Sequence, residues 1–123
     1  MLQIADDLFE QILTSAIDNL PPEHAEAIKN VAITYANKPT PLQRKLLKLR
    51  DDQSLYGLYE GVPLTARQGS IAYGPDRITL FKMPICSSVA NIPELTEQIK
   101  HTLWHEVAHY FGLDHAQIYK LEA

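Results

Sequence analysis

The chain has 123 residues, of which 46% are hydrophobic, and carries a formal net charge of −4. A chain of this length can bury one core but not two, so we expect a single domain over residues 1–123. The acidic balance argues against a nucleic-acid partner, because phosphate binding depends on basic surface.

Two further features bear on where the protein resides. No apolar run approaches the roughly eighteen residues that would suggest a membrane span, and Asp6, Asp7 and Glu10 differ from the basic start of a signal peptide. Cys86 is the only cysteine, so no intramolecular disulfide can form, in agreement with a reducing compartment. We therefore expect a cytoplasmic protein without a membrane partner.

The first part of the chain predicts helices around one strand. Apolar residues at helical spacing predict a helix over residues 4–20, which Pro21 and Pro22 end. A short helical turn is expected from Pro22, and the β-branched and aromatic residues 31–35 predict a strand. After Pro41, leucines alternate with a basic cluster that suggests a short amphipathic helix. The cluster consists of Lys38, Arg44, Lys45, Lys48 and Arg50. A solvated helix face explains it better than a nucleic-acid site, because no aromatic residues are interleaved.

The middle of the chain predicts short strands. Residues 55–64 indicate a strand that leads into an ordered loop, and residues 70–73 and 77–82 predict two strands separated by a turn. If strand 77–82 lies at the edge of the sheet, an extended peptide can pair with its backbone. Met83 and Cys86 are interpreted as core residues.

A long helix is predicted after this region. Asn91 followed by Glu94 resembles a capping box, and Pro93 is tolerated in the first turn, where its missing amide proton has no intrahelical partner. From there the helix can continue to Phe111, over about twenty residues and roughly 30 Å.

The most informative stretch begins at His105 and reads H-E-x-x-H-x-x-G-x-x-H. Residues i and i+4 of a helix lie on one face, so His105 and His109 can direct imidazole nitrogens at one metal ion. Glu106 has the place of a general base, close enough to take a proton from an attacking water. Gly112 can adopt the left-handed conformation that ends a helix, and the turn then brings His115 round as a third ligand.

Other interpretations of these histidines were weighed. They can be ordinary polar residues on a solvated helix face, but the apolar residues around them indicate a buried helix, in which unpartnered imidazoles are costly and a shared metal satisfies them. His101 lies one turn before His105, which suggests a competing triad. Three ligands in line along a straight helix cannot converge on a tetrahedral ion, so we favour His115 over His101.

Together with residues 58–64 and 75–81, the motif resembles the minimal zincin-like metallopeptidase family of bacteria, over nearly the whole chain. The resemblance implies an α+β fold of the minimal zincin-like type, in which a short mixed β-sheet packs on the active-site helix beside additional N-terminal helices. It also implies a zinc-dependent peptidase whose substrate is a peptide or an unfolded protein segment.

The chain departs from related patterns in two ways. The third ligand position of the family is commonly aspartate, whereas the matching residue here is His115, as in the metzincins. Metzincins carry a methionine after the third ligand, and no methionine follows His115. Membership of the large metzincin group is therefore not expected.

Three classes of function remain open. The first is a zinc peptidase in which one Zn²⁺ is held by His105, His109 and His115 and Glu106 moves the proton. The second is a non-catalytic metal-binding scaffold or regulatory protein-binding module. The third is a small-amide hydrolase with a closed pocket. The oxyanion donor is left unassigned among four tyrosines, each of which is interpreted first as a packing aromatic. They are Tyr59, Tyr73, Tyr110 and Tyr119.

Overall fold

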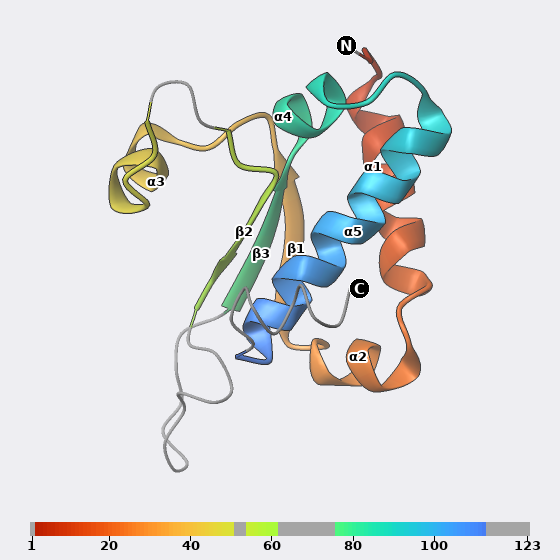
Figure 1. Ribbon diagram of the computed structural model, residues 1–123. Coiled ribbons are helices and arrows are strands. Elements are labelled where there is room, and N and C mark those ends of the chain that lie inside the picture. Colours follow the sequence, from red (N-terminus) through yellow and green to blue (C-terminus); the bar gives the residue numbers. More distant parts are fainter. Residues whose placement is uncertain (1, 51–53, 62–75, 113–123) are drawn as a thin grey trace.

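The computed structural model describes residues 2–50, 54–61 and 76–112. These residues form eight elements in the order α1 (Asp6–Asp18), α2 (Pro22–Ala27), β1 (Val31–Ala36), α3 (Pro41–Leu46), β2 (Gly57–Glu60), β3 (Asp76–Phe81), α4 (Lys82–Ser87) and α5 (Ile92–Tyr110). Helices and one small sheet make an α+β fold, as predicted (Figure 1).

The sheet is mixed, with the order β1-β3-β2. β1 runs parallel to β3, and β2 runs antiparallel to it. Ile78, Leu80 and Phe81 of β3 are 0% exposed, because this strand is paired on both sides and packs against α5. Strand 77–82 therefore does not lie at the edge, and the expectation that a peptide pairs with it is wrong. Residues 70–73, the other predicted strand, lie outside the described residues.

Helix α5 contacts both the sheet and the N-terminal helix α1. It packs against β2 and β3, and α1 packs against α5 (Figure 1). The buried side chains Phe9 and Leu13 of α1 and Ile99, Leu103 and Val107 of α5 belong to one hydrophobic cluster with residues of the sheet. This arrangement places the first and last described helices together in the core.

Capping explains where α5 begins. Asn91 Oδ1 accepts a hydrogen bond from the Glu94 backbone N–H at 2.9 Å, as the sequence predicted. The reciprocal bond differs from the usual capping box, because the Glu94 carboxylate accepts from the Asn91 side-chain amide at 2.9 Å and not from its backbone. Both bonds fix the first turn of the helix that carries the histidines.

Helix α4 was not predicted. It follows β3 directly and buries Ile85 and Cys86, as expected for Cys86. Met83 is 52% exposed, so its interpretation as a core residue is wrong. The reason is that α4 is short and turns only one side, the side of Ile85 and Cys86, toward the core.

In the described part of the chain, no helix combines the length and the apolar character that a membrane span requires.

Candidate metal centre

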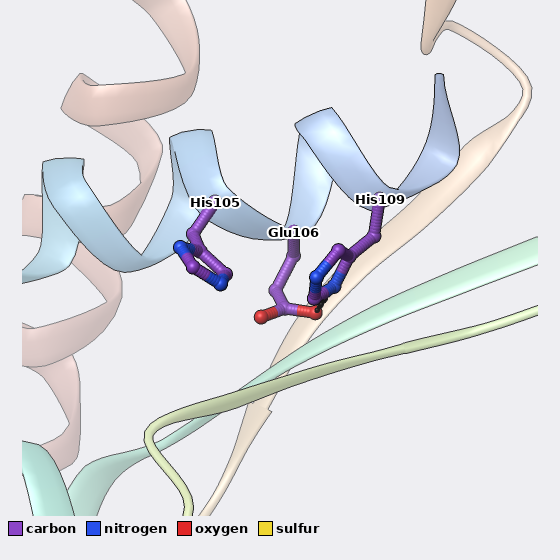
Figure 2. Close-up of side chains that lie close together, drawn as sticks. All are labelled: His105, Glu106 and His109. Atoms are coloured by element: carbon purple, nitrogen blue, oxygen red, sulfur yellow. Dashed lines mark hydrogen bonds and ion pairs between the residues drawn. The ribbon is translucent and has the colours of Figure 1, made fainter. Parts of the chain in front are cut away.

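His105 and His109 lie one turn apart on α5, and their side chains project from the same side of the helix together with Glu106 (Figure 2). The imidazole centroids are 4.9 Å apart. One ligand atom from each of the three residues lies within 4.8 Å of the other two. Such spacing allows the side chains to share one ion.

Glu106 is held between the helix and the sheet. Its side chain is only 7% exposed, and its Oε1 lies 3.0 Å from His109 Nδ1. A carboxylate that is hydrogen-bonded to one imidazole nitrogen orients the ring and leaves the other nitrogen available to coordinate a metal. The hydrogen bond to Glu106 raises the pKa of His109 above its ordinary value, burial opposes this, and the negative charge of Glu106 adds to the increase.

Gly57, the first residue of β2, allows the sheet to approach this carboxylate. A Cβ at Gly57 would lie 2.7 Å from Thr102 Cγ2 and 3.2 Å from Glu106 Cγ. At the first of these distances something must shift, so a residue other than glycine would displace the Thr102 side chain or move β2 and α5 apart. The close contact positions Glu106 relative to the strand.

Beside these residues lies a hollow of about 190 Å³ between α5 and the chain leading into β2. Its walls include His105 and Glu106 from the motif, together with Tyr56, Thr102 and Gln98. Gln98 donates a hydrogen bond to Thr102 Oγ1 at 3.0 Å, which holds one wall in place. The side chains of His105 and Glu106 thus border a small open space.

The sequence did not single out the other walls of this hollow. Gly57 and Tyr56 fell within the strand predicted from residues 55–64, and nothing at Gln98 or Thr102 resembled a motif. The available signal was the spacing of Gln98 and Thr102, which lie eight and four residues before Glu106. This spacing places both side chains on the same side of the helix as the Glu106 carboxylate.

Gly112 has the conformation that the sequence predicted. Its φ is +86°, in the left-handed region, and its backbone N–H donates to the His109 carbonyl at 2.9 Å. The helix therefore ends where the motif requires a turn. His115, the predicted third ligand, lies outside the described residues.

His101 is exposed and stands apart from the group formed by His105, Glu106 and His109. Its ring centroid is 6.2 Å from that of His105, farther than the separation of His105 and His109. It lines the hollow beside the motif residues. Of the four candidate tyrosines, Tyr59 and Tyr110 pack edge to face with centroids 5.8 Å apart, and Tyr73 and Tyr119 lie outside the described residues.

The donor set suits zinc. Imidazole nitrogen and carboxylate oxygen are ligands that Zn²⁺ accepts, and two histidines one turn apart supply two nitrogens without any change of backbone. The buried carboxylate adds negative charge beside them. These residues therefore fit the metal that the sequence motif implied.

Comparison with known families agrees with this geometry. Residues 28–123 match the zincin-like metallopeptidase family. This range includes the sheet, α5 and the motif, so the chain belongs to that family, and the resemblance seen in the sequence is confirmed. No curated protein matches the chain.

Proposed function

We propose that this protein is a zinc-dependent peptidase in which His105, His109 and His115 hold one Zn²⁺ and Glu106 is the general base. The observation that carries the proposal is the position of Glu106: its side chain is buried against Gly57, and its carboxylate lies beside the two imidazoles at the wall of a hollow. A scaffold needs the imidazoles, but it has no need of a second acid–base group at that place.

The reaction follows from the roles of these side chains. When bound, zinc supplies a Lewis acid that activates water and polarises the scissile carbonyl. The Glu106 carboxylate accepts a proton from the attacking water and later delivers it to the leaving amine. His109 is kept in its orientation by the 3.0 Å contact with Glu106 Oε1. The peptide occupies the hollow between α5 and Tyr56.

The shape of the hollow favours a peptide over a small amide. Two further hollows border it, one sharing Tyr56 with it and the other sharing Gln98 and His101. A small amide hydrolase would need an enclosed pocket, whereas a chain that extends beyond the scissile bond needs space on both sides. The proposed partner is therefore a peptide or an unfolded protein segment.

The test is Glu106→Gln. Glutamine keeps the size of the side chain and an oxygen acceptor for His109, so zinc content and folding should change little. Turnover should fall by about 10² to 10⁴, because an amide cannot take the water proton. The assay is cleavage of a broad peptide library by wild-type and variant protein, each loaded with zinc.

Two results would count against the proposal. If zinc-loaded wild-type protein cleaves no peptide, the result favours the non-catalytic scaffold over the peptidase. If Glu106→Gln cleaves as fast as wild type, Glu106 is not the base. His109→Ala serves as the matched control, since it should lose zinc and turnover together.

A further inference from the structure

A second hollow, of about 400 Å³, lies between α3 and α4. Lys38 and Arg44 line it, together with hydroxyl groups such as that of Ser54 and the partly exposed Tyr56 and Met83. The described residues that line it include no carboxylate. We call this hollow the cationic pocket, a local exception in a chain whose formal net charge is −4.

The two cations of the cationic pocket have no acidic partner among the described residues. Lys29, Lys82 and Lys100, in contrast, form salt bridges with Glu26, Asp6 and Glu97. A partner for Lys38 and Arg44 can therefore come from a ligand.

Arg44 is held in place. Its Nη2 donates to the Arg50 carbonyl at 2.6 Å, which orients the guanidinium, and no described residue accepts from its other N–H groups. An oriented guanidinium can donate two parallel hydrogen bonds to a carboxylate, and the exposed Lys38 adds a second positive charge. Tyr56 and Met83 offer apolar surface for the methylene groups that carry such a carboxylate.

The cationic pocket adjoins the candidate metal centre. Tyr56 lines both the cationic pocket and the hollow beside His105 and Glu106. The Phe81 backbone N–H donates to the Tyr56 carbonyl at 2.8 Å, so the wall between the two hollows is anchored to the chain at the end of β3. A peptide that lies over the metal centre and passes Tyr56 reaches the two cations.

We propose that the cationic pocket binds a carboxylate group of the peptide substrate. The inference rests on the proposed function for its choice of ligand. The carboxylate belongs either to an aspartate or glutamate side chain or to the C-terminus of the peptide, and both present the same two oxygens. Each partly exposed ion pair should change binding by a small factor, so two cations together should give about three- to tenfold discrimination.

The experiment measures binding and cleavage separately. Zinc-loaded Glu106→Gln protein is mixed with labelled pools of short peptides that are randomised except for one fixed glutamate or glutamine. Each pool is prepared with a free and with an amidated C-terminus, which distinguishes the two sources of the carboxylate. We expect the carboxylate-bearing pools to bind about three- to tenfold more tightly, and high salt to reduce the difference.

Charge reversal identifies the pocket. Lys38→Glu, introduced together with Glu106→Gln, should abolish the preference for carboxylate. The fold should be unaffected, because Lys38 is exposed and forms no salt bridge with the described residues. Lys45→Glu is the matched control. It makes the same change of charge on α3 but lies outside the lining of the pocket, so the preference should survive.

The outcomes separate this inference from the proposed function. Equal binding of all four pools, whatever the fixed residue or the C-terminus, or equal loss of preference in Lys38→Glu and Lys45→Glu, would overturn the cationic pocket. Cleavage by wild-type protein would continue in that case, and the peptidase would stand. If wild-type protein cleaves nothing while the Lys38-dependent preference persists, the peptidase falls and the carboxylate site stands.

Discussion

The hydrogen bond between His109 and Glu106 has a consequence for zinc-free protein. It raises the pKa of His109 above 6.5, so this pair stabilises the fold fully at pH values below 6.5. That stabilisation is lost as the pH rises through the raised pKa of the folded state. An NMR titration of zinc-free protein should give a His109 midpoint above 6.5. The midpoint in Glu106→Gln should be lower, since the neutral amide removes the negative charge.

The same pKa predicts how zinc binding depends on pH. A histidine must lose its proton to bind a metal, so zinc displaces a proton from His109 at pH values below the raised pKa. The apparent zinc affinity of wild-type protein should therefore increase with pH over this range. Calorimetry in two buffers with different ionisation enthalpies would measure the released proton. A zinc affinity that is independent of pH would argue that His109 is not a ligand.

Gly57→Ala tests the close contact between β2 and α5. The new methyl group would lie 2.7 Å from Thr102 Cγ2, so the helix or the strand must shift. Overpacking of this kind costs about 1 to 3 kcal/mol of unfolding free energy, which urea denaturation can measure.

The double variant Gly57→Ala/Thr102→Ser provides the control for that contact. Serine removes Cγ2 but keeps the hydroxyl that accepts the hydrogen bond from Gln98. We expect it to restore part of the lost stability. If the double variant is no more stable than Gly57→Ala, the cost arises elsewhere, such as at Glu106.

The N-terminal cap of α5 makes a prediction about the whole helix. Asn91→Ala removes the acceptor for the Glu94 N–H and should lower the unfolding free energy by about 0.5 to 2 kcal/mol. Asn91→Ser should retain most of that stability. Zinc affinity measured well below the melting temperature should be unchanged in both variants, because His105 and His109 lie more than three turns away.

Local signals in the sequence account for the elements that were predicted. Residues 4–20, 31–35 and 91–111 have clear periodicity or cap residues, and the structure has α1, β1 and α5 there. Helix α4 was not predicted because Lys82–Ser87 has neither a cap residue nor an amphipathic repeat. Its N-cap, Phe81, makes no side-chain hydrogen bond. Its conformation depends on burying Ile85 and Cys86 in the core.

Sheet order could not be derived from the strands themselves. Apolar and polar residues alternate too little in 77–82 to reveal whether one or two faces of the strand are buried. The parallel pairing with β1 also joins residues that are far apart in the sequence. For the same reason, the motif predicted His105, Glu106 and His109 as neighbours, whereas Gly57 and Tyr56 reach the centre only through the tertiary fold. The single-domain expectation for residues 1–123 stays a prediction.

Zinc should stabilise the whole molecule. A ligand that binds only the native state at a free concentration about a hundredfold above its Kd adds about 2.7 kcal/mol, which for a domain of this size corresponds to roughly 10 °C in melting temperature. Differential scanning calorimetry with zinc and with chelator would measure the shift. His109→Ala should show almost none. No shift in wild-type protein at saturating zinc would mean that the site does not form in solution.

The two halves of α5 differ in burial, which implies an uneven tolerance to substitution along that helix. From Thr102 onward, nearly every residue either packs in the core, faces Gly57 or belongs to the candidate metal centre. The first turns instead expose Pro93, Glu94 and Glu97 to solvent. A saturation mutagenesis library scored for folded, zinc-binding protein should thus accept many replacements in the first half of the helix and few in the second. Changes in what the protein recognises are then expected to accumulate in the surrounding segments, while the second half of α5, which carries the candidate metal centre, stays almost fixed.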